Sequence, residues 1–252
     1  MSSIDRTPML ARRAALLLAG ALVITAGTAA AAVIVVRSNG PSAVSYPPGT
    51  KLPDNGTVVL KPGDTLTVLD AHGTRVLRGS GAGAVKVSVA GSGAATVNGV
   101  AALIAANGQR QTRTGATRGQ NTQPRPTNVW VIDTTRSGTV CVADPRNLAL
   151  WRPTTESAAT LTLTRTSDGA STQAPFRAGQ AVRAWPLTEL SATDGAKVRI
   201  AGPDAKTPVT ITLKLLPTVP ATLDDTAAAL LAQGCNAQLD LLIAATSVDS
   251  TS

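Results

Sequence analysis

Short stretches that alternate apolar and polar residues, separated by turn residues, dominate the chain after residue 32. The clearest is Val209–Leu215, in which valine, isoleucine and leucine alternate with threonine and lysine. This period of two is typical of a β-strand with one buried face. Comparable β-type runs lie at residues 33–36, 58–61, 65–70, 74–78, 129–133, 139–142, 148–151, 160–165 and 197–200. We therefore expect a mainly β fold with one or two small β-sandwich or meander domains, in which 129–133 and 139–142 form a hairpin.

The last part of the chain, residues 218–246, changes to a helical period. Apolar residues recur at helical spacing, first at Leu223, Ala227, Leu230 and Leu231 and then at Cys235, Leu239, Leu242 and Ile243. Each group occupies one face of a helix. Thr222 suits the N-cap of the first helix, and Gly234 suits its end. A C-terminal helical pair that packs onto the β-domain is therefore expected.

A polar segment divides the β-type runs into two groups. Residues 107–128 contain four arginines but no acidic residue, no valine, isoleucine or leucine, and no aromatic residue. This composition cannot bury a core, so we expect a basic flexible linker. The expected organisation is an N-terminal β-rich domain at 33–106, the linker at 107–128, a β-sandwich-like domain at 129–217, the helical pair at 218–246 and a tail at 247–252.

The N-terminus has the pattern of an export signal. Arg12 and Arg13 precede an uncharged run over residues 14–36, and small residues follow its most apolar part. Residues 1–32 are therefore expected to be a signal peptide, cleaved after Ala31 or Ala32. The alternative is an uncleaved anchor, because this run is long enough to cross a ~30 Å hydrocarbon core. The first reading places the protein in the periplasm or elsewhere outside the cytoplasm. The second makes it inner-membrane anchored, and only then is membrane contact expected.

Cys141 and Cys235 are the two cysteines of the chain. In an exported protein two cysteines most simply form one disulfide. Closing a loop of this length stabilises the fold by roughly 4 kcal/mol in the chain-entropy model. The alternative is a cysteine nucleophile that works with His72, the single histidine.

The formal net charge of +8 is unevenly distributed. Residues 71–128 contain seven basic and no acidic residues, whereas the chain from Asp133 onward is close to neutral. Four linker arginines are candidates for binding phosphate or carboxylate groups: Arg110, Arg113, Arg118 and Arg125. Aromatic residues make up only 2% of the chain, which argues against a base-stacking platform. The expected partner is therefore an unknown envelope component, with an anionic one as the candidate, and no nucleic acid.

The sequence lacks the common catalytic and cofactor motifs. The glycine-rich stretch at 79–83 does not have the spacing of a nucleotide-binding loop, and there is no nucleophile elbow. One histidine and two cysteines exclude a multi-histidine metal site and a cysteine-rich zinc module. We expect no catalytic residue, cofactor or metal. Trp130, Trp151 and Trp185 are expected to be core or interface anchors.

Residues 35–81, 128–142, 150–153 and 230–242 together resemble uncharacterised exported proteins of Gram-negative bacteria. That resemblance covers most of the mature chain, implies export with signal cleavage and carries no assigned activity. A more local stretch, VVLKPGDTLTVLDAHGTRVLRG at 58–79, is similar to the periplasmic β-domain of FecR-like sensors. Those sensors have a substantial cytoplasmic region before their membrane span, where this chain has only about thirteen residues.

These features predict an exported cell-envelope protein that acts without catalysis, as a binding or structural module. One alternative is a FecR-like sensor or an assembly accessory of an envelope complex. The other is an enzyme whose site is not recognisable from sequence motifs.

Overall fold

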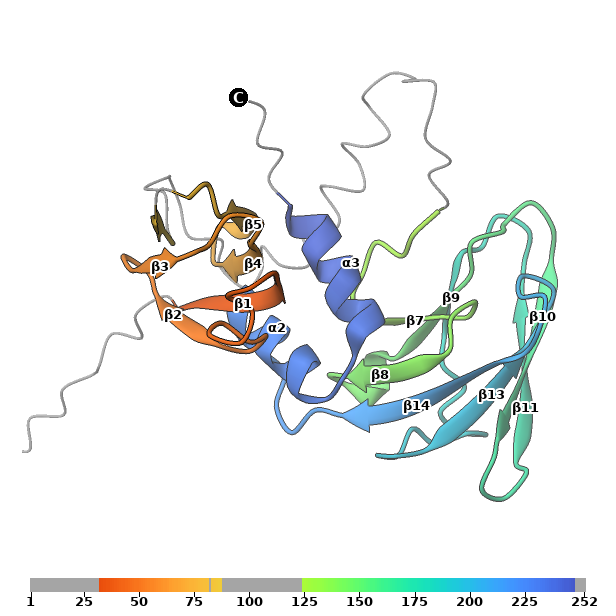
Figure 1. Cartoon of the computed structure of the whole chain (residues 1–252). Helices are drawn as coiled ribbons and strands as arrows, with labels where there is room; N and C mark the ends of the chain where they lie inside the picture. Colours follow the sequence, from red (N-terminus) through yellow and green to blue (C-terminus); the bar gives the residue numbers. More distant parts are fainter. Residues whose placement is uncertain (1–31, 82, 88–123, 248–252) are drawn as a thin grey trace, which may run out of the picture.

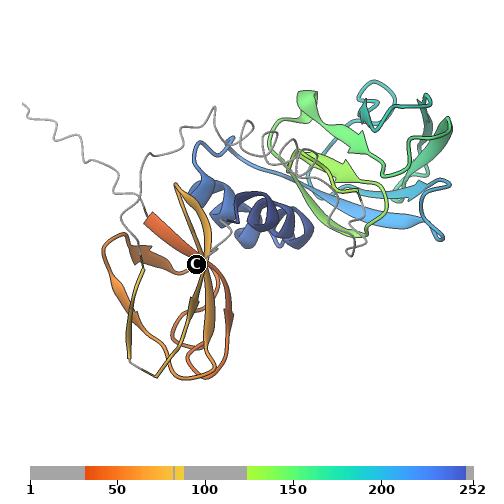
Figure 2. The ribbon, with the colours of Figure 1, turned by 90° about the horizontal axis from the view of Figure 1, so that it is seen from above.

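The computed structural model describes residues 32–81, 83–87 and 124–247. The described part is mainly β, with two C-terminal helices, as the sequence predicted. The helices lie between two β units, one formed by residues 32–87 and the other by residues 124–217 (Figures 1 and 2). No helix among the described residues is long and apolar enough to cross a membrane.

The first β unit consists of a four-stranded antiparallel sheet and a two-stranded sheet. The larger sheet has the order β2-β1-β4-β5, with bounds Lys51–Pro53, Ala32–Asn39, Thr65–Asp70 and Gly73–Arg78. The smaller sheet pairs β3 (Thr57–Val59) with β6 (Ala84–Lys86). Between them lies a core that includes Val33, Val35, Val58, Leu66 and Val68.

The four-residue apolar run at the start of β1 is buried on both faces of the sheet. Val33 and Val35 point into the core of this unit, whereas Ile34 and Val36 join a second cluster formed with the helices. Because both faces are covered, β1 needs a continuous apolar run and not an alternating one. The strand predicted at 33–36 is therefore confirmed.

The second β unit is a sandwich of two sheets. Its five-stranded sheet has the order β11-β10-β13-β14-β8, with bounds Ser171–Phe176, Ala159–Arg165, Lys197–Ala201, Val209–Leu215 and Gly138–Val142. Its three-stranded sheet has the order β12-β9-β7, with bounds Val182–Ala184, Ala149–Trp151 and Val131–Asp133. A short 3-10 helix, η1 (Pro145–Asn147), precedes β9.

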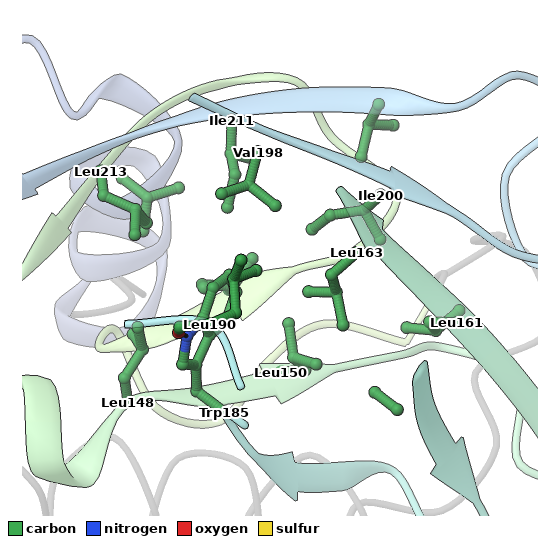
Figure 3. Close-up of a cluster of buried hydrophobic side chains, with 14 of the residues drawn as sticks. Leu148, Leu150, Leu161, Leu163, Trp185, Leu190, Val198, Ile200, Ile211 and Leu213 are labelled. Atoms are coloured by element: carbon green, nitrogen blue, oxygen red, sulfur yellow. Dashed lines mark hydrogen bonds between the residues drawn. The ribbon is translucent and has the colours of Figure 1, made fainter. Parts of the chain in front are cut away.

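Leucine, isoleucine and valine side chains from both sheets fill the interior of the sandwich (Figure 3). Trp185 lies among them, and its indole nitrogen donates a 2.6 Å hydrogen bond to the carbonyl oxygen of Leu190. A buried indole needs such an acceptor. Trp151 is also buried, so the prediction of tryptophan core anchors is confirmed for these two residues. Trp130 is partly buried and packs against the helix cluster.

The predicted hairpin between residues 129–133 and 139–142 is wrong. β7 pairs in parallel with β9, and β8 pairs in parallel with β14, so the two strands belong to different sheets. The turn between them crosses from one sheet to the other. Gly138, with a φ of 143°, lies where the chain enters β8. This arrangement lets each short apolar strand extend a larger sheet, which buries Ile132 and Val140 in the shared core.

The helical pair consists of α2 (Leu223–Ala232) and α3 (Asn236–Thr246). Thr222 caps α2 by accepting a 3.2 Å hydrogen bond from the backbone nitrogen of Asp225. Gly234 follows α2 with a φ of 70°, a conformation that glycine adopts without strain. Leu223, Ala227, Leu230, Leu239 and Leu242 are buried, as the helical spacing predicted.

The buried faces of the helices join the two β units. One apolar cluster contains Ile34 and Leu69 from the first unit, Val129 and Leu216 from the second, and the inward residues of α2 and α3. The disulfide between Cys141 in β8 and Cys235 before α3 is formed, as predicted, with Cα atoms 5.8 Å apart. At the other end of α3, the hydroxyls of Thr246 and Thr74 lie 2.7 Å apart. The helices therefore form a third apolar cluster, which joins the two β units.

Candidate functional site

An open cleft of about 1410 Å³ lies beside α3. One wall is the exposed side of α3, with Ala237, Leu241 and Ala244. The other wall is the flank of the sandwich where its two sheets end, because β7 and β8 are both edge strands. The loop between β13 and β14 and the segment at 124–126 complete the lining.

The unpaired charge in this cleft is mainly positive. Seven of its lining residues are charged, namely Arg37, Arg125, Arg136, Lys206, Asp133, Asp204 and Asp240. Two of the carboxylates are neutralised in ion pairs, Asp240 by Arg37 and Asp204 by Arg152. The third, Asp133, accepts hydrogen bonds of 2.9 and 2.7 Å from the backbone nitrogen and hydroxyl of Thr135.

Three exposed cations remain: Arg125, Arg136 and Lys206. Their side chains have no hydrogen bond or ion pair with any residue that the structure describes. Unpaired guanidinium and ammonium groups in one concave surface attract anions, and arginine can bind a carboxylate or phosphate through two parallel hydrogen bonds. The cleft therefore has the charge of an anion-binding site.

Asp204, which lines the cleft, belongs to a buried ion pair. The side chains of Arg152 and Asp204 are 1% and 5% exposed, and Nε of the arginine lies 2.9 Å from Oδ2 of the aspartate. The guanidinium also lies 5.7 Å from the centre of the Phe176 ring. Because neither charge is accessible, the pair has a structural role and connects the end of β9 to the β13–β14 loop. Lys206 is the accessible charge of that loop.

One edge of β8 faces α3 without a neighbouring strand among the described residues. At Cys141 the side-chain amide of Gln238 occupies this edge. Its Oε1 accepts a 2.6 Å hydrogen bond from the backbone nitrogen of Cys141, and its Nε2 donates to the carbonyl oxygens of Cys141 and Val129 at 2.9 and 2.8 Å. The amide therefore makes the contacts that the peptide group of a paired strand would make.

The structure places one of the four predicted anion-binding arginines in the cleft. Arg125 lines it, whereas Arg110, Arg113 and Arg118 lie outside the described residues. Sequence reasoning missed Arg136 and Lys206, which lie in separate turns that flank β8 and β14. Both are isolated basic residues in turns. The sequence offered one signal, namely that each lies shortly before a strand, Arg136 before β8 and Lys206 before β14.

The alternative of a cysteine nucleophile is wrong, because the sulfur atoms of Cys141 and Cys235 form the disulfide. His72 is exposed in the turn between β4 and β5. Within the described ranges, no three histidine, cysteine or acidic residues lie close enough together to hold a metal ion.

Comparisons with known proteins give no further information on this site, since no family model, curated protein or solved structure matches the chain.

Proposed function

We propose that this chain is an exported cell-envelope protein that binds an anionic partner in the cleft beside α3, without catalysing a reaction. The observation that carries this proposal is the set of three accessible, unpaired cations, Arg125, Arg136 and Lys206, in a cleft where, among the described residues, the only other charge outside an ion pair is the hydrogen-bonded carboxylate of Asp133. The partner would replace the counterions of these side chains, so its binding should weaken as ionic strength rises.

Two observations support export. The disulfide between Cys141 and Cys235 is the kind of bond that persists in oxidising compartments. The strand β1 begins at Ala32, and Val33, Ile34, Val35 and Val36 are buried in the fold. These four residues are therefore unavailable to a membrane span, which leaves residues 14–31 as the apolar stretch and favours a cleaved signal over an anchor.

Binding can be tested with inorganic polyphosphate as the anionic probe. In the full mature chain, replacing Arg125, Arg136 and Lys206 together by glutamine should lower the affinity about tenfold, because each exposed charge contact contributes roughly 0.5 kcal/mol. A matched control replaces three exposed cations outside the cleft, Lys51, Arg177 and Arg199, by glutamine. Equal loss in both triple variants would mean that only net charge matters, and the proposed site would be wrong.

The export proposal has a separate test. N-terminal sequencing of the protein recovered from outside the cytoplasm should give a start at Ala32 or Val33. A start at Met1 would show that the segment is not removed and would favour the anchored alternative.

A further inference from the structure

The free edge of β8 offers one more pair of backbone groups inside the cleft. Successive residues of a strand direct their backbone groups to opposite edges. Val142 faces β14, since its carbonyl oxygen accepts a 2.9 Å hydrogen bond from the backbone nitrogen of Leu216. Cys141 faces the other way, toward Gln238. Thr139, two residues earlier, therefore has its N–H and C=O on the same outward edge as Cys141.

No described residue pairs with the outward edge of β8 at Thr139. β14 is the only strand of the described ranges with which β8 pairs, and it lies on the opposite side. Thr139 lines the cleft together with Ser137, Gly138 and Val140. An unpaired donor and an unpaired acceptor at a strand edge form a template for a further strand.

The chemistry of this edge distinguishes between possible anionic ligands. Thr139 presents both a donor and an acceptor, and a polyphosphate chain supplies acceptors only. A peptide in extended conformation supplies an N–H and a C=O at the spacing that the edge requires. The amide of Gln238 already makes this pair of hydrogen bonds with the N–H and C=O of Cys141. An added strand would make the same pair with the N–H and C=O of Thr139.

We propose that the cleft binds an extended acidic peptide, which adds as a strand to the edge of β8 at Thr139 while its carboxylates contact Arg125, Arg136 and Lys206. This inference rests on the proposed function and names the chemical class of the partner. Gln238 sets the end of the added strand, because its side chain occupies the edge beyond that point.

The test uses the full mature chain and an eight-residue peptide that alternates glutamate and threonine, with blocked ends. Binding is measured by calorimetry against the same peptide methylated at every backbone nitrogen. The methylated peptide keeps its charge but cannot donate to the carbonyl oxygen of Thr139 and is too bulky for the edge. We expect it to bind at least about tenfold more weakly, the effect of losing two hydrogen bonds. Equal affinity of the two peptides would overturn the proposal.

A pair of variants tests the same contact by changing the protein in place of the peptide. Thr139→Pro removes the outward N–H and leaves the bonds to β14, which Gly138 and Val140 make, whereas Thr139→Val keeps the N–H. Only Thr139→Pro should fail to bind the peptide. Melting temperatures show whether each variant is folded. If Thr139→Pro is unfolded, the comparison of methylated and unmethylated peptides is the test of the added strand.

Polyphosphate separates this inference from the proposed function. Binding of polyphosphate in the absence of peptide binding would retain the anion-binding cleft and reject the added strand. Failure of both probes to bind would reject both proposals. Binding of the peptide that survives the triple replacement of Arg125, Arg136 and Lys206 would reject the role of these cations.

Discussion

Single side chains connect the secondary-structure elements of this protein. Gln238 projects from α3 and satisfies the backbone N–H and C=O of Cys141, which no strand of the described chain reaches. Asp64 acts similarly in the first β unit, where its Oδ1 accepts from the backbone nitrogen of Ser42 at 3.0 Å and its Oδ2 from that of Lys61 at 2.5 Å. In both cases a buried polar side chain binds backbone groups that no neighbouring strand among the described residues pairs.

Replacing Gln238 by alanine should lower the free energy of unfolding by about 2–3 kcal/mol. The change removes three hydrogen bonds and leaves the buried N–H and C=O of Cys141 without partners. Urea unfolding measures this loss. Gln233→Ala is the matched control, because Gln233 is exposed and its side chain has no partner among the described residues. A loss of similar size in the control would show that the effect is not specific to the edge of β8.

Asp64 should make stability depend on pH in the acid range. Its hydrogen bonds, first to the Ser42 side chain and backbone, hold its pKa below the ordinary value of 3.8. A carboxylate with a lowered folded pKa contributes stability that is complete above its unfolded pKa and is lost as pH falls through the folded pKa. The melting temperatures of wild type and Asp64→Asn should therefore differ by a constant amount above about pH 5, and the difference should shrink below pH 3.8.

The control for this pH dependence is Glu156→Gln. It removes an exposed carboxylate that has no hydrogen-bond partner among the described residues. Its melting temperature should follow that of wild type throughout the range. A difference between wild type and Asp64→Asn that stays constant down to pH 2 would contradict the assigned cause.

At the scale of elements, α3 is fixed at both ends and in the middle. The disulfide holds Cys235, the residue before α3, to β8. Arg37 of β1 forms an ion pair with Asp240, and Thr246 contacts Thr74 of β5. β8 itself has one edge paired with β14 and the other directed at α3. The width of the cleft thus depends on the position of α3 relative to β8.

Removal of the disulfide should test how much this bridge stabilises the fold. Replacing Cys141 and Cys235 together by alanine should reduce the free energy of unfolding by roughly 2–5 kcal/mol, mainly because the unfolded chain is no longer constrained. The same loss should appear in wild type unfolded in the presence of a reductant, and the reductant should have no effect on the double variant. An unchanged midpoint in the double variant would show that the bridge does not constrain the chain.

At the scale of the whole molecule, the two β units share the helical pair as a common core. Ile34 and Val36 of the first unit, and Val129 and Leu216 of the second, all belong to the cluster around α2 and α3. Without the helices, each unit would expose an apolar face to water. We therefore expect the two units to unfold together.

Cooperative unfolding can be measured with two natural probes. Tyr46 reports on the first unit, where its hydroxyl accepts from the backbone nitrogen of Val59, and the three tryptophans report on the second. Leu230→Ala should lower both midpoints, because the cavity that it leaves in the shared cluster lowers the free energy of unfolding by about 2–4 kcal/mol. The control Val219→Ala, at a side chain that is 61% exposed, should lower neither. Separate midpoints for the tyrosine and tryptophan signals would refute a shared core.

Local patterns were sufficient for several elements. Val209–Leu215 is a strand with the bounds that its alternation predicted, because a strand with one face in the core requires that period. Thr65–Asp70 is also a strand, but five of its six residues are buried, since the helices and the smaller sheet cover its two faces. β11 and β12 were not predicted as strands, because β11 contains a proline and few apolar residues and β12 has only three residues.

Periodicity, composition and the number of cysteines were enough to predict the class of the fold, the two helices, the disulfide partners and the uneven distribution of charge. They could not predict that β7 and β8 belong to different sheets, or that Arg125, Arg136 and Lys206 line the same cleft. Strand pairing and convergence of charges depend on contacts between residues far apart in the chain. A local pattern shows which face of a strand is buried, but the packing of the whole molecule decides which neighbour lies at its edge.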